Sequence, residues 1–290
     1  MGEKLRQIFA HKDLRKRLLF VIVILVLTRL LAHVPVPGVD VSQVKNFFDQ
    51  NQIFGLVNLF SGGGLSNFSI AMMGVGPFIT ASIIMQLLTM ASPKLEALQK
   101  EEGEQGRRKI SQYTRILTIP LAAIQAFGMI KLLQSQSLGG QPIVGSFSVS
   151  QWLLTTIVLI AGTMLLMWLG ELITEKGVGN GISIIIFSGI VAGLPGALTR
   201  SFSATASGSQ VFELALLAAV AALIVFAIVF VTEGQRNIPV TYARRVAGLR
   251  QSGSTDIHLP LRVNQAGVVP IIFAISVVLL PGIYAELFKT

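Results

Sequence analysis

The sequence contains no cysteine, which excludes both a disulfide framework and a metal site built on thiolates. It has only three histidines, His11, His33 and His258, and their wide separation argues against a histidine metal site. Charge is scarce too, because charged residues make up 13% of the chain, whereas about a quarter is typical of soluble domains. Hydrophobic residues make up 52%, and the mean hydropathy is +0.70. This composition predicts a polytopic membrane protein.

The patterns of an enzyme or a pump are missing as well. The stretch 177–181 reads GVGNG, but no Lys-Ser/Thr follows and no βαβ unit surrounds it, so it predicts a tight turn before a helix. The sequence has no H-E-x-x-H motif and no Ser, His and Asp set for an intramembrane protease. The charges in the predicted spans, Arg29, Glu171 and Glu213, lie near the span ends, where Arg29 can snorkel. We therefore expect no enzyme activity, no cofactor and no metal.

Seven apolar stretches are candidates for membrane spans. The first has a basic flank like a signal peptide, but no A-x-A site follows it, so we expect a retained helix. Several spans contain proline, which frees a backbone carbonyl that a neighbouring helix or water must satisfy, so these helices belong in a bundle with an interior. The predicted spans are Leu18–Val34, Val75–Met90, Tyr113–Leu133, Trp152–Ile173, Ile182–Leu198, Val211–Val231 and Ala266–Leu287.

Basic residues are concentrated in the N-terminal tail and in the loops after the second, fourth and sixth spans. Lys and Arg accumulate on the cytoplasmic side of membrane proteins, so this bias predicts a cytoplasmic N-terminus. It also explains much of the net charge of +9. The loops predicted on the other side, Pro35–Gln52, Gln134–Gln151 and Thr199–Gln210, are short and polar, and none is a domain.

The one sizeable soluble element is the cytoplasmic loop Glu233–Arg262. It contains two β-prone runs, Ile238–Val246 and Ile257–Val263, with Gly, Ser and Gln between them, which predicts a hairpin-like projection. Pro239 and Pro260 weaken the two runs and leave their pairing open.

The stretch Phe54–Thr89 organises the rest of the chain. A short apolar segment is broken by Gly62, Gly63 and Gly64, and a second short piece precedes a continuous apolar helix. The first part is too short to span a bilayer, which needs roughly 20 apolar residues. Irregular backbone at membrane depth needs surrounding protein or water, so we predict a half-inserted, mobile plug in a cavity. The alternative is a loop packed on the outer surface.

Four stretches of the chain, taken in order, resemble the SecY family, the channel subunit of the protein translocon. They read FSGGGLSNFSI with GPFITASIIMQLLT, then EGEQGRRKISQYTR, MWLGELITEKGVGNGISIIIF and HLPLRVNQAGVVPIIFA. The resemblance covers essentially the whole chain, and four long motifs make it specific.

The resemblance implies an all-α polytopic membrane protein with a SecY-type helix bundle, whose ten spanning helices form two inverted halves. It divides this chain into a cytoplasmic tail, 1–17, a first half, 18–200, with the plug at 54–70, and the start of a second half, 201–290, with the cytoplasmic loop 233–262. The chain would then stop in the seventh helix, so we expect an incomplete channel, truncated after helix seven.

The resemblance also assigns sites. Isoleucines four residues apart share one helix face, and by themselves they would be core or lipid-facing. The family's pore ring matches Ile79, Ile83, Ile182, Ile186 and Ile272. Its plug matches Leu59, Phe60, Ser61, Gly62, Gly63, Gly64 and Leu65. Its cytoplasmic docking loop matches Arg236, Arg244, Arg245 and Arg250, which could otherwise serve only as an orientation signal.

The function that the resemblance implies is passive conduction of unfolded secretory proteins across the bacterial cytoplasmic membrane, with lateral release of apolar segments into lipid. The implied partners are the SecE and SecG subunits, the SecA motor ATPase, the ribosome, nascent polypeptides with their signal sequences, and membrane insertion factors. A secondary transporter for a small solute is the main alternative, since inverted repeats are common there too. A purely structural membrane scaffold is a third.

Overall fold

The structure is a computed structural model, and it describes residues 11–36, 41–50, 63–135, 137–138, 141–142, 145, 147–203, 210–240, 257–262 and 264. The described chain forms two compact units, one up to Arg200 and one from Ser201. The first holds α2 (Lys12–His33), α3 (Val41–Gln50), α5 (Gly76–Ala91), α6 (Pro93–Lys100), α7 (Gly103–Ser135), β1 (Ser137–Leu138), β2 (Gln141–Pro142), α8 (Val149–Lys176) and all but the end of α9 (Gly181–Ser203). The second holds α10 (Gln210–Glu233), β3 (Gln235–Val240) and β4 (Ile257–Arg262).

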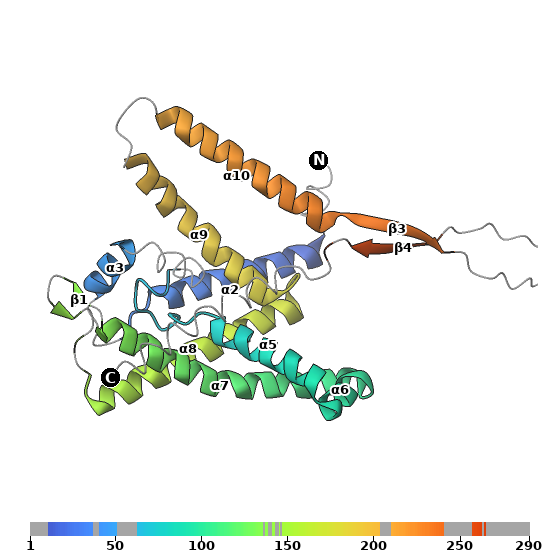
Figure 1. Cartoon of the computed structure of the whole chain (residues 1–290), viewed down its shortest axis with the longest axis horizontal. Helices are drawn as coiled ribbons and strands as arrows, with labels where there is room; N and C mark the ends of the chain where they lie inside the picture. Colours follow the sequence, from blue (N-terminus) through green and yellow to red (C-terminus); the bar gives the residue numbers. More distant parts are fainter. Residues whose placement is uncertain are drawn as a thin grey trace, which may run out of the picture. The chain divides into compact units, whose positions relative to one another are not determined.

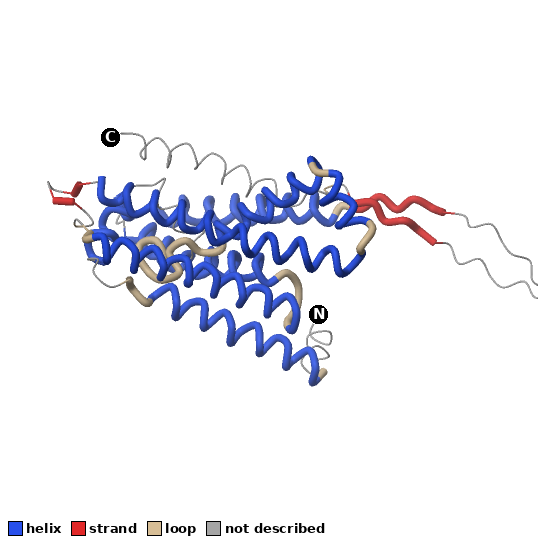
Figure 2. The backbone as a smooth tube through the Cα atoms, turned by 90° about the horizontal axis from the view of Figure 1, so that it is seen from below, coloured by secondary structure: helices blue, strands red, loops and turns tan. Residues whose placement is uncertain are grey.

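Within the first unit, α5, α7 and α8 lie side by side, and α2 packs along α8 (Figure 1). Figure 2 shows that most of the described chain is helix. One face of α7 explains the close packing, because every fourth residue from Thr114 to Ile130 is buried. Four of these five are threonine or alanine, and such small residues let membrane helices approach closely. The hydroxyls of Thr114 and Thr118 donate to carbonyls of their own helix, so no polar group is left unsatisfied there.

The helices confirm the expectation of an all-α polytopic fold, but the individual spans need correction. Among the described residues, three helical stretches are long and apolar enough to cross a membrane: Gly103–Gln134, Val149–Lys176 and Leu216–Glu233. The pair α5 and α6 is a fourth if its two bent parts count as one span. The first predicted span, Leu18–Val34, falls in α2 except for its last residue. Helix α2 does not qualify as a span, because every stretch of 18 residues within it contains Lys16, Arg17 and Arg29. The apolar part of α9 is shorter than a span, and Ala266–Leu287 lies outside the described residues.

The basic region after the second span is helical, although the sequence predicted a loop there. The chain bends by 102° between α5 and α6, where Pro93 starts the new helix. Helix α7 then begins at Gly103, ten residues before the predicted start of the third span. Ion pairs one turn apart, Lys100 with Glu96 and Arg108 with Glu104, supply the local reason for helix formation.

The loop expected at Pro35–Gln52 also contains a helix, α3. Its residue Val44 is fully buried, and so is Val36 just before it. Both side chains join an apolar cluster with residues of α7 and α8. The loop therefore covers one end of the first unit, which its mixed composition did not reveal.

The predicted hairpin is confirmed, with corrected bounds. β3 and β4 pair antiparallel from Gln235↔Arg262 to Val240↔Ile257, and the hairpin continues from the end of α10 (Figure 1). Residue pairs in such a ladder alternate between hydrogen-bonded and non-hydrogen-bonded. The pairs Pro239↔His258 and Asn237↔Pro260 are two positions apart, so they belong to the same class. If that class is the non-hydrogen-bonded one, neither proline interrupts a hydrogen bond of the ladder. The register thus accommodates both prolines.

Candidate functional site

An irregular segment, residues 63–75, includes the last residues of the predicted plug, 54–70, and leads into α5. We call it the base segment. Two backbone hydrogen bonds fasten it to the chain after α2: the N–H of Val36 donates to the carbonyl of Phe68 at 2.9 Å, and that of Ile70 to the carbonyl of Val34 at 3.0 Å. Phe68 has a φ of 42°, in the left-handed region that residues other than glycine rarely adopt. These bonds hold the strained turn in place and satisfy buried backbone groups.

The base segment is also packed from all sides. Leu65, Phe68 and Met72 are buried in the cluster that includes residues of α3, α7 and α8. At Gly162 of α8, a Cβ atom would lie 2.0 Å from the carbonyl oxygen of Ile70, so only glycine permits this close approach. Irregular backbone is therefore enclosed by protein within the helix bundle, as the membrane environment requires.

Of the predicted plug residues, Gly63, Gly64 and Leu65 belong to this base segment. Gly64 and Leu65 are buried, and the carbonyl of Gly64 accepts bonds from both the N–H and the hydroxyl of Ser69. The other predicted plug residues, Leu59, Phe60, Ser61 and Gly62, lie outside the described residues. The assignment of a plug stays a prediction.

Three of the predicted pore isoleucines meet at one place. Ile79 of α5 and Ile182 and Ile186 of α9 pack against a cluster of buried residues that we call the inner cluster, which consists of Ala32, Ala71, Val75 and Leu166. Ile83 is buried one turn further along α5, and Ile272 lies outside the described residues. The structure thus brings together side chains from helices more than 100 residues apart. Their role as a ring is still a prediction.

The start of α9 confirms the predicted tight turn at 177–181. Gly179 has a φ of 75°, and the side chain of Asn180 accepts a hydrogen bond from the N–H of Ser183 in the first turn of the helix. The N–H of Gly181 donates to the hydroxyl of Thr174 at 2.8 Å. A Cβ on Gly181 would lie 1.9 Å from the carbonyl oxygen of Gly170, so α9 begins in direct backbone contact with α8.

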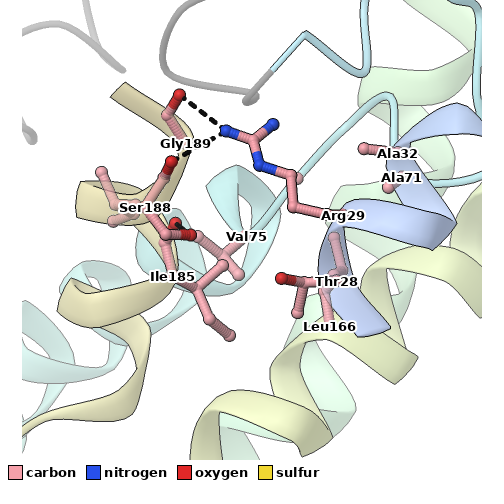
Figure 3. Close-up of a pocket in the computed structure, with 11 residues that line it drawn as sticks. Thr28, Arg29, Ala32, Ala71, Val75, Leu166, Ile185, Ser188 and Gly189 are labelled. Atoms are coloured by element: carbon pink, nitrogen blue, oxygen red, sulfur yellow. Dashed lines mark hydrogen bonds between the residues drawn. The ribbon is translucent and has the colours of Figure 1, made fainter. Parts of the chain in front are cut away.

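The sequence did not reveal the role of Arg29. Instead of snorkelling, its guanidinium reaches across to α9 and donates to the carbonyls of Ser188 at 2.8 Å and Gly189 at 3.1 Å (Figure 3). Arg29 lines a small cavity of about 30 Å³ together with residues of α2, the base segment, α8 and α9. That volume holds a water molecule or two. No sequence pattern marks the contact, because its acceptors are backbone carbonyls 159 and 160 residues away.

A second charged contact joins α7 and α8. Arg115 donates to the carboxylate of Glu171 at 2.9 Å. Among the described residues, no group of three or more His, Cys, Asp or Glu could hold a metal ion. The inner cluster itself consists of apolar side chains.

Only part of the predicted docking loop is described. Arg236 lies on β3, is exposed and pairs with Leu261 across the hairpin. Arg244, Arg245 and Arg250 lie outside the described residues. The docking role of all four remains a prediction.

Comparison with known proteins decides the family. The sequence model of the SecY family matches residues 69–290, which is most of the chain. The chain belongs to the SecY family. The match takes in residues 69–75 of the base segment, the predicted pore isoleucines and the hairpin, and the resemblance found in the four motifs is confirmed.

One relative in the SecY family is the protein translocase subunit SecY of Streptomyces scabiei, which is 44% identical over 287 residues. The match covers 96% of this chain but only 65% of the relative, so the chain spans about two thirds of its relative's length. The comparisons lend no support to the alternative of a solute transporter.

Solved structures of SecY and Sec61 channels share the fold of this chain. One is described as showing that the plug domain of the SecY protein stabilises the closed state of the translocation channel and maintains a membrane seal. It has a TM-score of 0.58 at 18% identity and covers 92% of this chain and 56% of that one. Sec61 in the canine ribosome–channel complex from the endoplasmic reticulum has a TM-score of 0.56 at 17% identity, covering 92% and 57%. At this identity the match supports the fold alone, and it agrees with the SecY-type bundle.

Proposed function

We propose that the chain is the main part of a channel subunit that passes unfolded secretory proteins across the bacterial cytoplasmic membrane and releases apolar segments sideways into lipid. The observation that carries the proposal is the convergence of Ile79, Ile182 and Ile186 on the inner cluster, directly beside the enclosed base segment. Because the chain spans about two thirds of its curated relative, the activity belongs to the whole protein.

In this proposal Ile79, Ile83, Ile182, Ile186 and Ile272 line the constriction. Apolar side chains cannot replace the hydration shell of an ion, and a narrow apolar passage gates by dewetting. The same side chains offer no hydrogen bonds that would hold a passing polypeptide. A passage that conducts proteins without conducting ions needs this chemistry.

The plug, residues 54–70 with Leu59–Leu65 at its centre, would close the passage. Its last residues are buried and hydrogen-bonded within the base segment, so in this proposal they serve as the fixed base of the plug. The plug domain named for the related SecY structure supports the assignment.

We place the protein in the bacterial cytoplasmic membrane with its N-terminus in the cytoplasm, on the distribution of its basic residues. Residues 18–200 would form the first half of the channel and residues 201–290 the start of the second. The hairpin and the linking residues, with Arg236, Arg244, Arg245 and Arg250, would then face the cytoplasm. There they could meet the phosphates of ribosomal RNA or the SecA motor, since basic clusters attract both. SecE and SecG would complete the assembly, and nascent chains with signal sequences would be its cargo.

The test is reconstitution of the complete channel in proteoliposomes with its motor ATPase and a denatured secretory precursor. We expect the precursor to become protected from external protease in an ATP-dependent way. Replacement of Ile83 or Ile186 by glycine should raise the ion conductance of the resting channel. Small-solute uptake without precursor transport would instead support a transporter and contradict the proposal.

A further inference from the structure

The contact between Arg29 and α9 is the one place within the predicted spans of the described chain where a side-chain charge bonds to the backbone of another helix. A charge at membrane depth is costly unless it is hydrogen-bonded, so an arginine there needs acceptors. Two main-chain carbonyls of α9 provide them. The hydroxyl of Ser188 does not compete, because it donates to the carbonyl of Ile185 in its own helix.

Helix α9 has a second attachment at its beginning. Gly181 meets the backbone of Gly170 and donates to Thr174, which fixes the first turn of α9 against α8. The pore isoleucines Ile182 and Ile186 lie between this attachment and the carbonyls that Arg29 holds. Among the described residues, the helix pairs in close contact are α5 with α6, α7 and α8, α6 with α7, α7 with α8, and α2 with α8, and α9 is not among them. The two polar attachments therefore bracket the pore isoleucines on a helix with little other backbone contact.

We propose that Arg29 is a positioning residue for the channel: it acts as a latch from α2 that fixes the rotation of α9 and so holds Ile182 and Ile186 in the closed constriction. The inference rests on the proposed function, because it assumes that α9 lines the passage. Arginine suits the task better than lysine, because its planar guanidinium presents several donors in a fixed arrangement. Loss of the latch would leave α9 held by its first turn and by the apolar packing of residues such as Ile182 and Ile186, without a polar contact that fixes its rotation, so the constriction could widen.

The first experiment measures ion conductance of the assembled, resting channel in a planar bilayer, with Arg29→Gln and Arg29→Lys. Charge-assisted hydrogen bonds of this kind shift an equilibrium by roughly tenfold or more, so we expect Arg29→Gln to raise the leak about tenfold. Arg29→Lys should leak less, because it keeps the charge. The matched control is Lys131→Gln, an exposed cation that also lies four residues before the end of its helix, and it should behave as wild type.

A second experiment separates positioning from general destabilisation and uses the absence of cysteine from residues 1–290, with any cysteine in the rest of the assembly replaced beforehand. The double variant Arg29→Cys with Ser188→Cys should leak until a flexible thiol cross-linker about as long as an arginine side chain joins the two sites, and then seal. A leak that the cross-linker does not reduce would overturn the latch. So would wild-type conductance of Arg29→Gln in a channel that leaks with Ile83→Gly. If neither Arg29→Gln nor Ile83→Gly leaks and the channel transports no precursor, the proposed function itself fails.

Discussion

Helices α8 and α10 are both apolar enough to span a membrane, yet they differ in how much of each is buried within its own unit. In an apolar stretch of 18 residues of α8, 44% of the residues are buried. In the apolar stretch of the same length in α10, none are buried. The buried residues of α8 form a stripe with helical spacing that includes Leu159, Gly162, Leu166 and Gly170. Apolar composition thus locates a helix in the membrane but does not say whether protein or lipid faces it.

Glycine accounts for the close backbone contacts of α8. Gly162 and Gly170 bring the backbone of α8 next to the base segment and the start of α9. Helix α10 has several alanines but no glycine, and its large apolar side chains, such as Phe226 and Phe230, are exposed. Lipid tails are as apolar as leucine, so close backbone approach, and not hydrophobicity, drives association of membrane helices. The comparison predicts that matched substitutions will disturb α8 and spare α10.

Gly162→Leu should have the largest effect. A Cβ alone would lie 2.0 Å from the carbonyl oxygen of Ile70, and that backbone cannot move without breaking the bonds of the base segment. We expect a loss of more than about 3 kcal/mol, and therefore loss of folded protein. Ala222→Leu on the exposed face of α10 should be neutral. The measurement for both variants is thermal unfolding of the complete protein in detergent, followed by circular dichroism. Equal losses of stability for the two variants would contradict the proposed difference in packing between α8 and α10.

Leu159→Ala should come next. Leu159 is fully buried in the cluster around the base segment, so the substitution leaves a cavity and costs about 2–4 kcal/mol. Leu223 of α10 is 67% exposed, and Leu223→Ala should cost less than about 0.5 kcal/mol because lipid fills the space. Both tryptophans, Trp152 and Trp168, are on α8, so their fluorescence reports the α8 variant directly. An α10 variant as destabilised as the α8 variant would show that α10 is packed in the assembled protein.

Glu171→Gln should have a smaller effect. It removes the ion pair with Arg115, which ties α8 to α7, but both side chains are partly exposed. Pairs of this kind contribute about 0.5–1 kcal/mol. The control is Glu175→Gln, an exposed carboxylate one turn further along the same helix. A double-mutant cycle with Arg115→Gln measures the coupling, and zero coupling would mean that packing alone holds the two helices together.

Thr163→Val should have the smallest effect. The hydroxyl of Thr163 is buried and donates to the carbonyl of Leu159, and valine of nearly the same shape loses only that bond. We expect a cost of about 0.5 kcal/mol. Thr232 of α10 makes the same kind of bond to Ile228 at an exposed position, and Thr232→Val should have no measurable cost. If the two variants give indistinguishable melting curves, burial does not strengthen this hydrogen bond. Burial would then stabilise α8 through packing alone.

Several features of the fold were predictable from the sequence because each depends on local chemistry. Glycine and asparagine at 177–181 predicted the turn before α9, and the continuous apolar run from Pro77 predicted α5, in whose first turn Pro77 lies. The β-prone runs predicted the hairpin, but the bounds of β3 depended on the register with β4. Helices α3 and α6 were missed, because an amphipathic decamer and a charged octamer carry too weak a pattern to be distinguished from polar loops.

The features of the candidate site also divide into those that the sequence predicted and those that only the tertiary structure shows. The sequence by itself determined that the chain belongs in a membrane, that isoleucines share helix faces, and that irregular backbone precedes α5, since composition and spacing suffice for these. Only the tertiary structure decided that Ile79, Ile182 and Ile186 meet at one cluster and that Gly162 touches the carbonyl of Ile70. It also decided that Arg29 bonds to α9. The physical reason is that these contacts join backbone carbonyls and small residues far apart in the chain, and a backbone carbonyl has no residue type by which a sequence could reveal it.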